Sequence, residues 1–385
     1  MPAGMTRFGA TATAIRMHIL QIFHDHERGG VETLGNMLEA GLSPHRLAFE
    51  TVYLYPRPGL PALAKLRCAV ALARRIWRGD FDALIAYQST ASVLAGVIGR
   101  LRGCGLRIVH QTCTPAEMAP PIRVLDKLAG TAGCYSYNIA NSAATWSEFA
   151  HYPASYRRSM VLIEHGLDAP TPTHMREEAR RRFNLPAGQP ILLNVGRLAA
   201  QKNQDLLIRA LACVPEAHLV LAGGGLEEDS YRTLAATLGV TDRLHVLGPL
   251  PAADIADLYS AADLFVFPSA WETFGLAAVE AAMVGLPMVV ADLAVLREVL
   301  RADGAEPVAY VAPYDLEAWI GAIRAALAAP PSRRTVGTFA RVMRRKYSRE
   351  RMIESYLGLF DAPPPHGRGE LREADLPATA EQARP

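Results

Sequence analysis

Hydrophobic residues occur along this chain in short runs, and each run is followed by a segment in which apolar residues recur at helical spacing. Short continuous apolar runs are typical of strands buried on both faces of a parallel sheet. Their alternation with helical segments predicts an α/β protein with two Rossmann-like, doubly wound units. In the first half, strands are predicted at residues 17–23, 49–55, 83–87, 106–110, 137–140 and 160–163. In the second half, they are predicted at residues 191–195, 218–222, 244–247, 264–267, 288–291 and 309–311.

The helical segments are amphipathic, and the best defined one spans residues 61–78. There Leu63, Leu66, Val70, Ala73 and Trp77 share one face. Further helices are predicted at residues 204–213, 226–238, 253–261, 316–327 and 341–360.

The same pattern divides the chain into two domains. Residues 17–170 are predicted to form an N-terminal domain, and residues 171–345 a C-terminal domain, with a Pro- and Thr-rich boundary near residue 170. Residues 1–16 and 361–385 are expected to be disordered extensions. Two facing α/β domains create a cleft at the carboxyl ends of their strands, where ligands bind in such folds.

Composition is that of an ordinary globular protein of two domains, with 385 residues and half of them apolar. The five cysteines are scattered, which favours a reducing, cytoplasmic compartment over a disulfide or zinc framework. No apolar run approaches the roughly 18 residues that span a bilayer. Residues 1–170 hold 17 basic against 12 acidic residues. This surplus favours contact with an anionic membrane face or a phosphorylated acceptor, although solvated helix faces would account for it equally well. We expect no nucleic-acid partner.

The most informative stretch follows the apolar run at residues 264–267. A helical pattern begins at Phe274 and is stopped by Gly285, while Glu272 and Glu280 stand eight positions apart. Eight residues make about 2.2 turns, so both carboxylates fit along one helix edge. Unpaired N–H groups at a helix start attract anions. A phosphate there, with a carboxylate on either side to accept sugar hydroxyls, suits a nucleotide-sugar, whereas two solvated glutamates are the alternative.

A second cluster follows the predicted strand at residues 191–195. Gly196 allows the backbone to turn, and Arg197 and Lys202 are five positions apart on the same loop. Arginine supplies a planar fork and lysine a point charge, so both could reach one diphosphate. A surface loop with chance basic residues is the alternative.

Together these stretches carry a family resemblance. The sequence from Phe267 to Ala281, with Pro268-Ser269, Glu272, Phe274-Gly275-Leu276 and Glu280, resembles the E-x7-E donor signature of a large retaining glycosyltransferase family. That family is of the family 4 type and includes sucrose synthase and bacterial mannosyltransferases. Gly196-Arg197-Leu198 with Lys202-Asn203 resembles its diphosphate-binding loop.

The resemblance implies a GT-B architecture and assigns roles to the matching residues. Arg197 and Lys202 would stabilise the leaving diphosphate, Glu272 would bind sugar hydroxyls and Glu280 the ribose. Further donor contacts are expected from Gly196, Gly224, Thr273, Phe274, Gly275 and Leu276. The final helix, residues 346–360, would cross back onto the first domain.

Two first-domain features also match the family in part. Gly29-Gly30, after the first strand, is similar to a glycine loop that faces the donor across the cleft. His110 ends a strand in a region where relatives carry a histidine that contacts the donor sugar. The alternative for His110 is a hydrogen-bonded structural histidine, with the family position falling on Thr112 or Cys113.

The resemblance implies a hexosyltransferase that retains anomeric configuration and moves sugar from a UDP- or GDP-sugar to an acceptor hydroxyl. Arg197, Lys202 and Glu272 would carry the chemistry, without cofactor or metal. A saccharide or lipid-linked acceptor is expected, in polysaccharide or glycolipid synthesis, together with peripheral contact at the inner membrane face. The alternatives are a nucleotide-sugar epimerase or phosphorylase on the same fold, and a non-catalytic nucleotide-sugar-binding protein.

Overall fold

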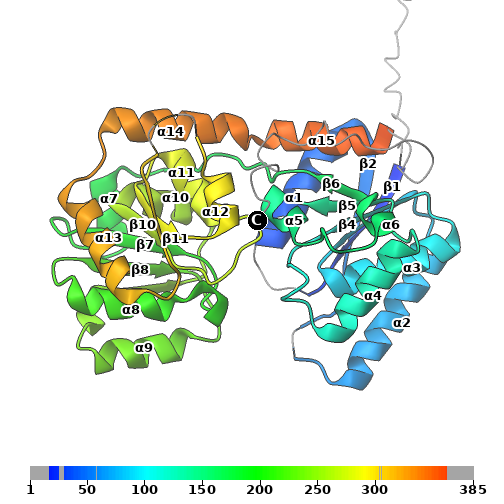
Figure 1. Cartoon of the computed structure of the whole chain (residues 1–385), viewed down its shortest axis with the longest axis horizontal. Helices are drawn as coiled ribbons and strands as arrows, with labels where there is room; N and C mark the ends of the chain where they lie inside the picture. The colour runs from blue at the N-terminus through cyan, green and yellow to red at the C-terminus, as the bar shows by residue number, and fades with distance from the viewer. Residues whose placement is uncertain (1–16, 26–29, 58, 303, 305, 362–385) are drawn as a thin grey trace, which may run out of the picture.

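The computed structural model describes residues 17–25, 30–57, 59–302, 304 and 306–361. It contains two parallel sheets side by side, each covered by helices on both faces (Figure 1). This confirms the predicted pair of doubly wound units. The predicted extension at residues 1–16 and nearly all of the predicted tail lie outside the described residues. Within the described part, no helix is both long and apolar enough to cross a bilayer.

The first sheet has the strand order β2-β1-β3-β4-β5-β6 and the second the order β12-β11-β10-β7-β8-β9. The strands of the first are β1 (Met17–Phe23), β2 (Leu47–Tyr53), β3 (Ala83–Tyr87), β4 (Leu106–His110), β5 (Tyr137–Ala140) and β6 (Met160–Leu162). Those of the second are β7 (Ile191–Val195), β8 (His218–Ala222), β9 (Leu244–Gly248), β10 (Leu264–Phe267), β11 (Met288–Ala291) and β12 (Val308–Val311).

The strand order fixes where a ligand can bind. In the second sheet the chain runs outward from β7 through β8 to β9, and then returns to the other side of β7 with β10. The loops that leave β7 and β10 therefore diverge at the carboxyl edge, which is where ligands bind in open α/β sheets. In the first sheet the corresponding switch point lies between β1 and β3.

Helices of the first domain form two layers. On one face lie α2, α3, α4 and α6, which contact each other in that order along the sheet, and on the other lies α1. Their bounds are α1 (Gly30–Leu42), α2 (Ala62–Arg78), α3 (Ser89–Arg102), α4 (Pro120–Thr131), α5 (Ala143–Ser147) and α6 (Ala154–Arg157), with the 3₁₀ turn η1 (Ser43–His45).

Helices of the second domain also cover both sheet faces, with α8, α9 and α13 on one and α7, α10, α11 and α14 on the other. Their bounds are α7 (Arg176–Arg182), α8 (Gln204–Cys213), α9 (Glu228–Thr237), α10 (Ala252–Ala261), α11 (Leu276–Val284), α12 (Ala294–Val299), α13 (Leu316–Ala328) and α14 (Arg333–Lys346). The 3₁₀ turns are η2 (Ala200–Lys202) and η3 (Thr241–Arg243).

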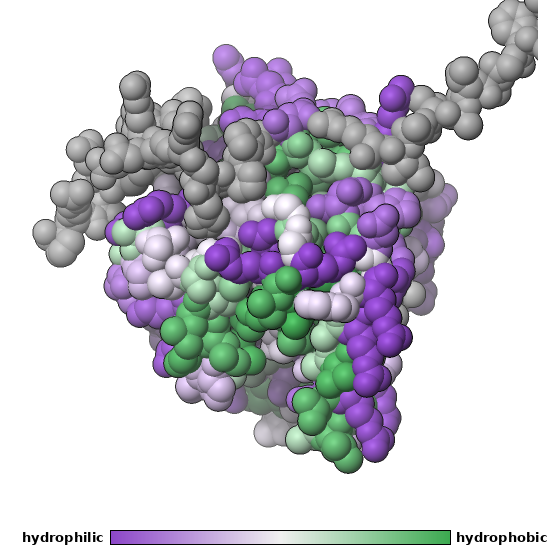
Figure 2. Space-filling view, turned by 90° about the vertical axis from the view of Figure 1, so that its right-hand side faces the viewer, coloured by the Kyte–Doolittle hydropathy of each residue, from purple (hydrophilic) through white to green (hydrophobic). Residues whose placement is uncertain are grey.

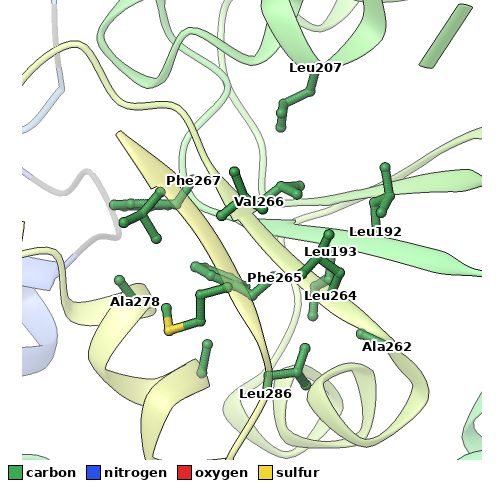
Figure 3. Close-up of a cluster of buried hydrophobic side chains, with 14 of the residues drawn as sticks. Leu192, Leu193, Leu207, Ala262, Leu264, Phe265, Val266, Phe267, Ala278 and Leu286 are labelled. Carbon is green, nitrogen blue, oxygen red and sulfur yellow. The ribbon is translucent and has the colours of Figure 1, made fainter. Parts of the chain in front are cut away.

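The core of the second domain lies between these layers and its sheet. Phe265 and Phe267 of β10 are fully buried, and so is Ala278 of α11. Figure 3 shows Leu207 of α8 on one side of the strands and Ala278 on the other. Because both faces of β10 are covered, the strand is apolar at every position, which explains its uninterrupted hydrophobic run.

The end of the chain differs from the single helix predicted at residues 341–360. There are two helices, α14 and α15 (Arg349–Asp361), which run along the top of both domains (Figure 1). They are separated at Tyr347 and Ser348, where the carbonyl of Tyr347 accepts a hydrogen bond from Leu167 N at 2.8 Å. The interdomain linker therefore pairs with the chain at this break. Beyond it, α15 packs on α1, and Tyr356 and Phe360 enter the first-domain core.

Candidate active site

The loops after β7 and β10 bring two predicted residues into contact. The ammonium group of Lys202 forms an ion pair and hydrogen bond with the carboxylate of Glu272. Both side chains are largely buried, at 15% and 8% exposed, and the Lys202 ammonium also lies 5.1 Å from the ring centre of Phe267. A cation and an anion far apart in the sequence therefore meet at the switch point of the second sheet.

Two neighbouring side chains hold these loops together. Asn203 adopts a left-handed backbone conformation with φ of 52°, and its amide nitrogen donates to the carbonyls of Pro268 and Pro313. The side-chain amide of Gln201 donates to the backbone carbonyl of Trp271 at 3.0 Å, and the backbone carbonyl of Gln201 accepts a hydrogen bond from Ala270 N. These bonds fix the loop that carries Lys202 against the loop that carries Glu272.

Glycines allow the loops after β7 and β8 to touch. Gly196 N donates to Ala222 O, and Leu198 N donates to Gly224 O at 2.9 Å. A Cβ atom on Gly223 would lie 2.0 Å from Gly196 O, a distance that no side chain tolerates. Arg197 has an exposed side chain and lies on the loop after β7 that ends at Lys202. The two loops in contact therefore contain all four predicted residues, Gly196, Gly224, Arg197 and Lys202.

We expect Gly223→Ala to disturb this edge because its Cβ would collide with the backbone of Gly196. The free energy of unfolding should fall by about 2 kcal/mol more than in Gly239→Ala. Gly239 is a matched control, since it also has positive φ (68°) but no atom within 4 Å of its Cβ position. Chemical denaturation of both variants measures the difference. Equal losses would contradict the close approach of the two turns.

The start of α11 corrects part of the prediction. The helix begins at Leu276, after Gly275 in a left-handed conformation with φ of 85°, and not at Phe274. The side chain of Phe274 is buried and packs against the rings of His165 and Tyr347. This side chain therefore belongs to the core of the protein.

Thr273 lies at the contact between the domains. Its hydroxyl accepts a hydrogen bond from Asn141 at 3.2 Å, and its carbonyl accepts from the hydroxyls of Ser142 and Thr145. These three donors follow β5 in the first domain. Thr273, which directly follows Glu272, is thus held by the first domain.

Glu280 is the fifth residue of α11, so it lies about one turn into the helix and not two as predicted, because the helix begins later. It accepts a hydrogen bond from the Tyr259 hydroxyl at 2.8 Å. Burial raises the pKa of Glu280, and the bond from Tyr259 opposes that effect. Since Glu280 is on α11 and Glu272 is in the loop before it, the two carboxylates flank the start of this helix.

The first domain approaches the same helix start from across the cleft. A Cβ atom on Gly30, the first residue of α1, would lie 2.7 Å from Leu276 Cδ1. A larger residue there would require the side chain of Leu276 to move. Gly29 lies outside the described residues.

The prediction that His110 contacts the donor is not supported by its position. His110 is 3% exposed, and its two ring nitrogens lie 3.3 Å from Ala86 O and 2.6 Å from the Tyr356 hydroxyl. It also stacks on Tyr87, with 4.4 Å between ring centres. Burial lowers the pKa of His110 to about 3, so it is neutral. The alternative, a structural histidine that anchors α15 to β4, accounts for all these contacts.

A second buried histidine stands at the crossing between the domains. The Asn141 amide donates to His165 Nε2 at 3.1 Å, and the ring of His165 meets Phe274 edge-on. Nearby, both carboxylate oxygens of Glu298 in α12 accept hydrogen bonds, from Ala143 N and Ala144 N at the start of α5. A carboxylate there satisfies free N–H groups and complements the helix dipole.

His165 should make the protein sensitive to acid. Burial lowers the pKa of His165 from 6.5 to about 4. The unfolded chain therefore binds this proton first, and the free energy of unfolding falls as the pH drops below about 7, by about 2 kcal/mol at pH 5. In His165→Asn this contribution is removed, so the thermal midpoint should drop less between pH 7 and pH 5 than in the parent protein. Identical drops would contradict the assignment.

One Asp-x-Asp sequence occurs, Asp80-Phe81-Asp82, but it lies far from the site along the fold. It precedes β3 at the amino end of the first sheet, where Asp82 accepts a hydrogen bond from His18 N at 2.7 Å. Asp80 is fully exposed beside Arg102. The cleft lies at the carboxyl ends of the strands, so these carboxylates do not belong to it. Among the described residues, no cluster of three or more His, Cys, Asp or Glu side chains suits a metal ion.

Several positioning residues escaped the sequence analysis. Gln88, at the first-sheet switch point, has φ of 67° and ψ of 142°, a region that non-glycine residues rarely occupy. Its side-chain oxygen accepts from His24 N at 3.1 Å. Glu298 and the bonds of Asn203 were also missed. Each depends on contacts distant in sequence, and no local spacing signals such contacts.

Comparison with known proteins agrees with this geometry. Residues 175–343 match the family model of "Glycosyl transferases group 1". A D-inositol 3-phosphate glycosyltransferase of Catenulispora acidiphila is 33% identical over 248 residues, which cover 58% of this chain and 59% of that protein. The enzyme of the same name from Mycolicibacterium smegmatis is 38% identical over 183 residues, covering 46% and 42%. The chain thus matches less than two thirds of the length of these curated relatives.

Solved structures share the fold over nearly the whole chain. HepE of Anabaena, in complex with UDP and glucose, superposes with a TM-score of 0.75 at 20% identity and covers 90% of this chain and 99% of its own. Sucrose-phosphate synthase from Thermosynechococcus elongatus gives 0.75 at 20% identity, covering 90% and 98%. The architecture is therefore the GT-B fold of these proteins. Residues 175–343 are similar in sequence to the glycosyl transferases group 1.

Proposed function

We propose that this protein transfers a hexosyl group from a UDP- or GDP-sugar to an acceptor hydroxyl, with retention of anomeric configuration. The observation that carries the proposal is the contact of Lys202 with Glu272 at the switch point of the group 1 domain. A largely buried cation next to a largely buried carboxylate offers partners for a phosphate and for sugar hydroxyls at once. HepE, which shares the fold, is described in complex with UDP-glucose.

The diphosphate would lie between the basic loop after β7 and the start of α11. Lys202 has three N–H donors, so it can keep Glu272 and still bind a phosphate oxygen. Arg197 is exposed on the same loop, and the first N–H groups of α11 are free of helical partners. These groups would stabilise the charge that grows on the leaving diphosphate.

The transfer itself exchanges two bonds at the anomeric carbon. The bond to the β-phosphate oxygen breaks, and a bond to the acceptor oxygen forms on the same face of the sugar. The acceptor proton passes to the departing phosphate oxygen, and the nucleoside diphosphate leaves. Glu272 would hold sugar hydroxyls and Glu280 would accept from the ribose, so neither needs to attack the sugar.

The acceptor is proposed to be a saccharide or a lipid-linked molecule in cell-surface polysaccharide or glycolipid synthesis, at the cytoplasmic face of a membrane. The named relatives act on an inositol phosphate, so an anionic acceptor is consistent with the basic surplus of residues 1–170.

A donor-hydrolysis assay tests the proposal. The full chain is incubated without acceptor with UDP- and GDP-sugars in turn, and release of nucleoside diphosphate is followed. We expect slow release from one donor, and the same donor should raise the thermal midpoint. A donor that raises the midpoint without any release, with or without candidate acceptors, would indicate a binding protein. No release and no midpoint shift with any donor would reject the proposal.

A further inference from the structure

The outer helical layer of the first domain carries an unusual concentration of exposed apolar side chains. Eight of the eleven large hydrophobic side chains exposed among the described residues lie on α2, α3 and α4. These helices are adjacent, since α3 contacts both of the others. Figure 2, which views this side of the molecule, shows apolar areas bordered by strongly hydrophilic ones. Monomeric soluble proteins seldom gather such residues without a binding role.

The regular apolar face of helix α2 is exposed and does not face the core. Leu63, Leu66 and Trp77 are 60%, 60% and 57% exposed. On the opposite side of the helix, only Leu72 and Ile76 are buried in the domain. The regular apolar face seen in the sequence thus points away from the core. The contact of α2 with the core does not use the apolar face that carries Leu63, Leu66 and Trp77. That face is therefore available for a partner.

The charges that α2 itself carries have one sign. Every charged residue of α2 is basic, and Arg67, Arg74 and Arg78 lie next to the apolar stripe at helical spacing. The described residues supply no ion pair to these three arginines. Arginines along one border of an exposed Leu and Trp stripe are the arrangement of a helix that lies flat in a membrane interface.

Helix α4 continues the same surface. Val124, Leu125 and Leu128 are 56%, 48% and 61% exposed, and Arg123 flanks them. Its one acidic residue, Asp126, points inward, where it accepts hydrogen bonds from the hydroxyls of Tyr135 and Tyr156. The exposed charge of α4 is therefore also positive.

We propose that the outer face of α2, α3 and α4 docks onto an anionic lipid bilayer, with the apolar side chains in the interface and the arginines on lipid phosphates. The charge of this face favours a bilayer over a second copy of the chain as the partner. An isologous contact would bring the same arginines together, and like charges oppose such a contact. An anionic bilayer satisfies both the apolar and the cationic part. The inference deepens the membrane side of the proposed function, but it needs no donor chemistry.

Vesicle co-sedimentation of the full chain tests the proposal. The protein should bind vesicles of phosphatidylglycerol, bind phosphatidylcholine vesicles weakly, and detach as salt is raised. Leu66→Gln with Trp77→Gln should weaken binding about tenfold or more. Arg74→Gln with Arg78→Gln should weaken it about fivefold per arginine. Since all four side chains are exposed, the variants should keep their thermal midpoints.

Matched controls lie in the second domain. Tyr314→Gln removes an aromatic residue that is 73% exposed, and Arg333→Gln with Arg334→Gln removes two exposed arginines of α14. Neither should change vesicle binding. If the parent protein ignores anionic vesicles, or the α2 variants bind as well as the controls, the proposal fails. A parent dimer that the α2 variants dissolve would identify a second copy as the occupant instead. A midpoint shift with the nucleotide donor, measured without vesicles, reports separately on the proposed function.

Discussion

Lys202→Ala is expected to lower the turnover number of hexosyl transfer by about 100-fold or more, the usual effect of removing one preorganised stabiliser of a leaving group. In the structure, Lys202 is largely buried beside Glu272, and no other lysine or arginine of the described residues bonds to that carboxylate. The substitution therefore removes a cation that solvent cannot replace. Steady-state kinetics with the donor identified by hydrolysis measures the effect.

A change of charge elsewhere on the same domain should not have this effect. Arg209→Ala removes a half-exposed cation of α8, which pairs at its surface with Asp205. Its turnover should match that of the parent protein. A loss below about tenfold in Lys202→Ala would mean that the lysine only supports Glu272 and does not touch the leaving group.

Glu272→Gln should separate recognition of the sugar from recognition of the diphosphate. The carboxylate neutralises Lys202 and is proposed to accept sugar hydroxyls, and glutamine keeps the shape but loses the charge. Without this ion pair, the ammonium group of Lys202 would be free to bind the phosphate alone. Nucleoside diphosphate should therefore bind as tightly as before or more tightly. Transfer should fall about 100-fold because the sugar loses a charge-assisted hydrogen bond. Calorimetric titration with UDP or GDP, beside the transfer assay, measures both.

The matched control is Glu317→Gln, which neutralises an exposed glutamate in the first turn of α13. It should leave binding and transfer unchanged. If Glu272→Gln weakened nucleoside diphosphate and nucleotide-sugar equally, Glu272 would act by positioning Lys202, and its proposed contact with the sugar would be wrong.

The sheet framework could be read from the sequence because its signal is local. Strands such as β7 and β10 are buried on both faces, so their residues are apolar apart from Asn194 of β7, and the strand ends are marked by Gly196 or Pro268. The site loops follow those strands directly, so residue types and spacing indicated both loops. The strand order that places Lys202 and Glu272 at one switch point comes from the structure.

What the sequence did not indicate depends on three-dimensional neighbours. Periodicity identified α2 correctly as a helix, but the same periodicity fits an apolar face that points inward or outward. His110 follows a buried strand, and only the contact with Tyr356, 246 positions later, shows that it is structural. At the break between α14 and α15, Tyr347 O accepts a hydrogen bond from Leu167 N, which is 180 positions earlier in the chain. Such contacts leave no trace in local spacing.

A crystal structure of the protein with bound UDP or GDP tests the central claim most directly. The account predicts that oxygens of the diphosphate lie within hydrogen-bond distance of Lys202 Nζ and of the N–H groups that open α11, with the Arg197 guanidinium turned toward them. A diphosphate bound elsewhere, with Lys202 still engaged only by Glu272, would contradict it.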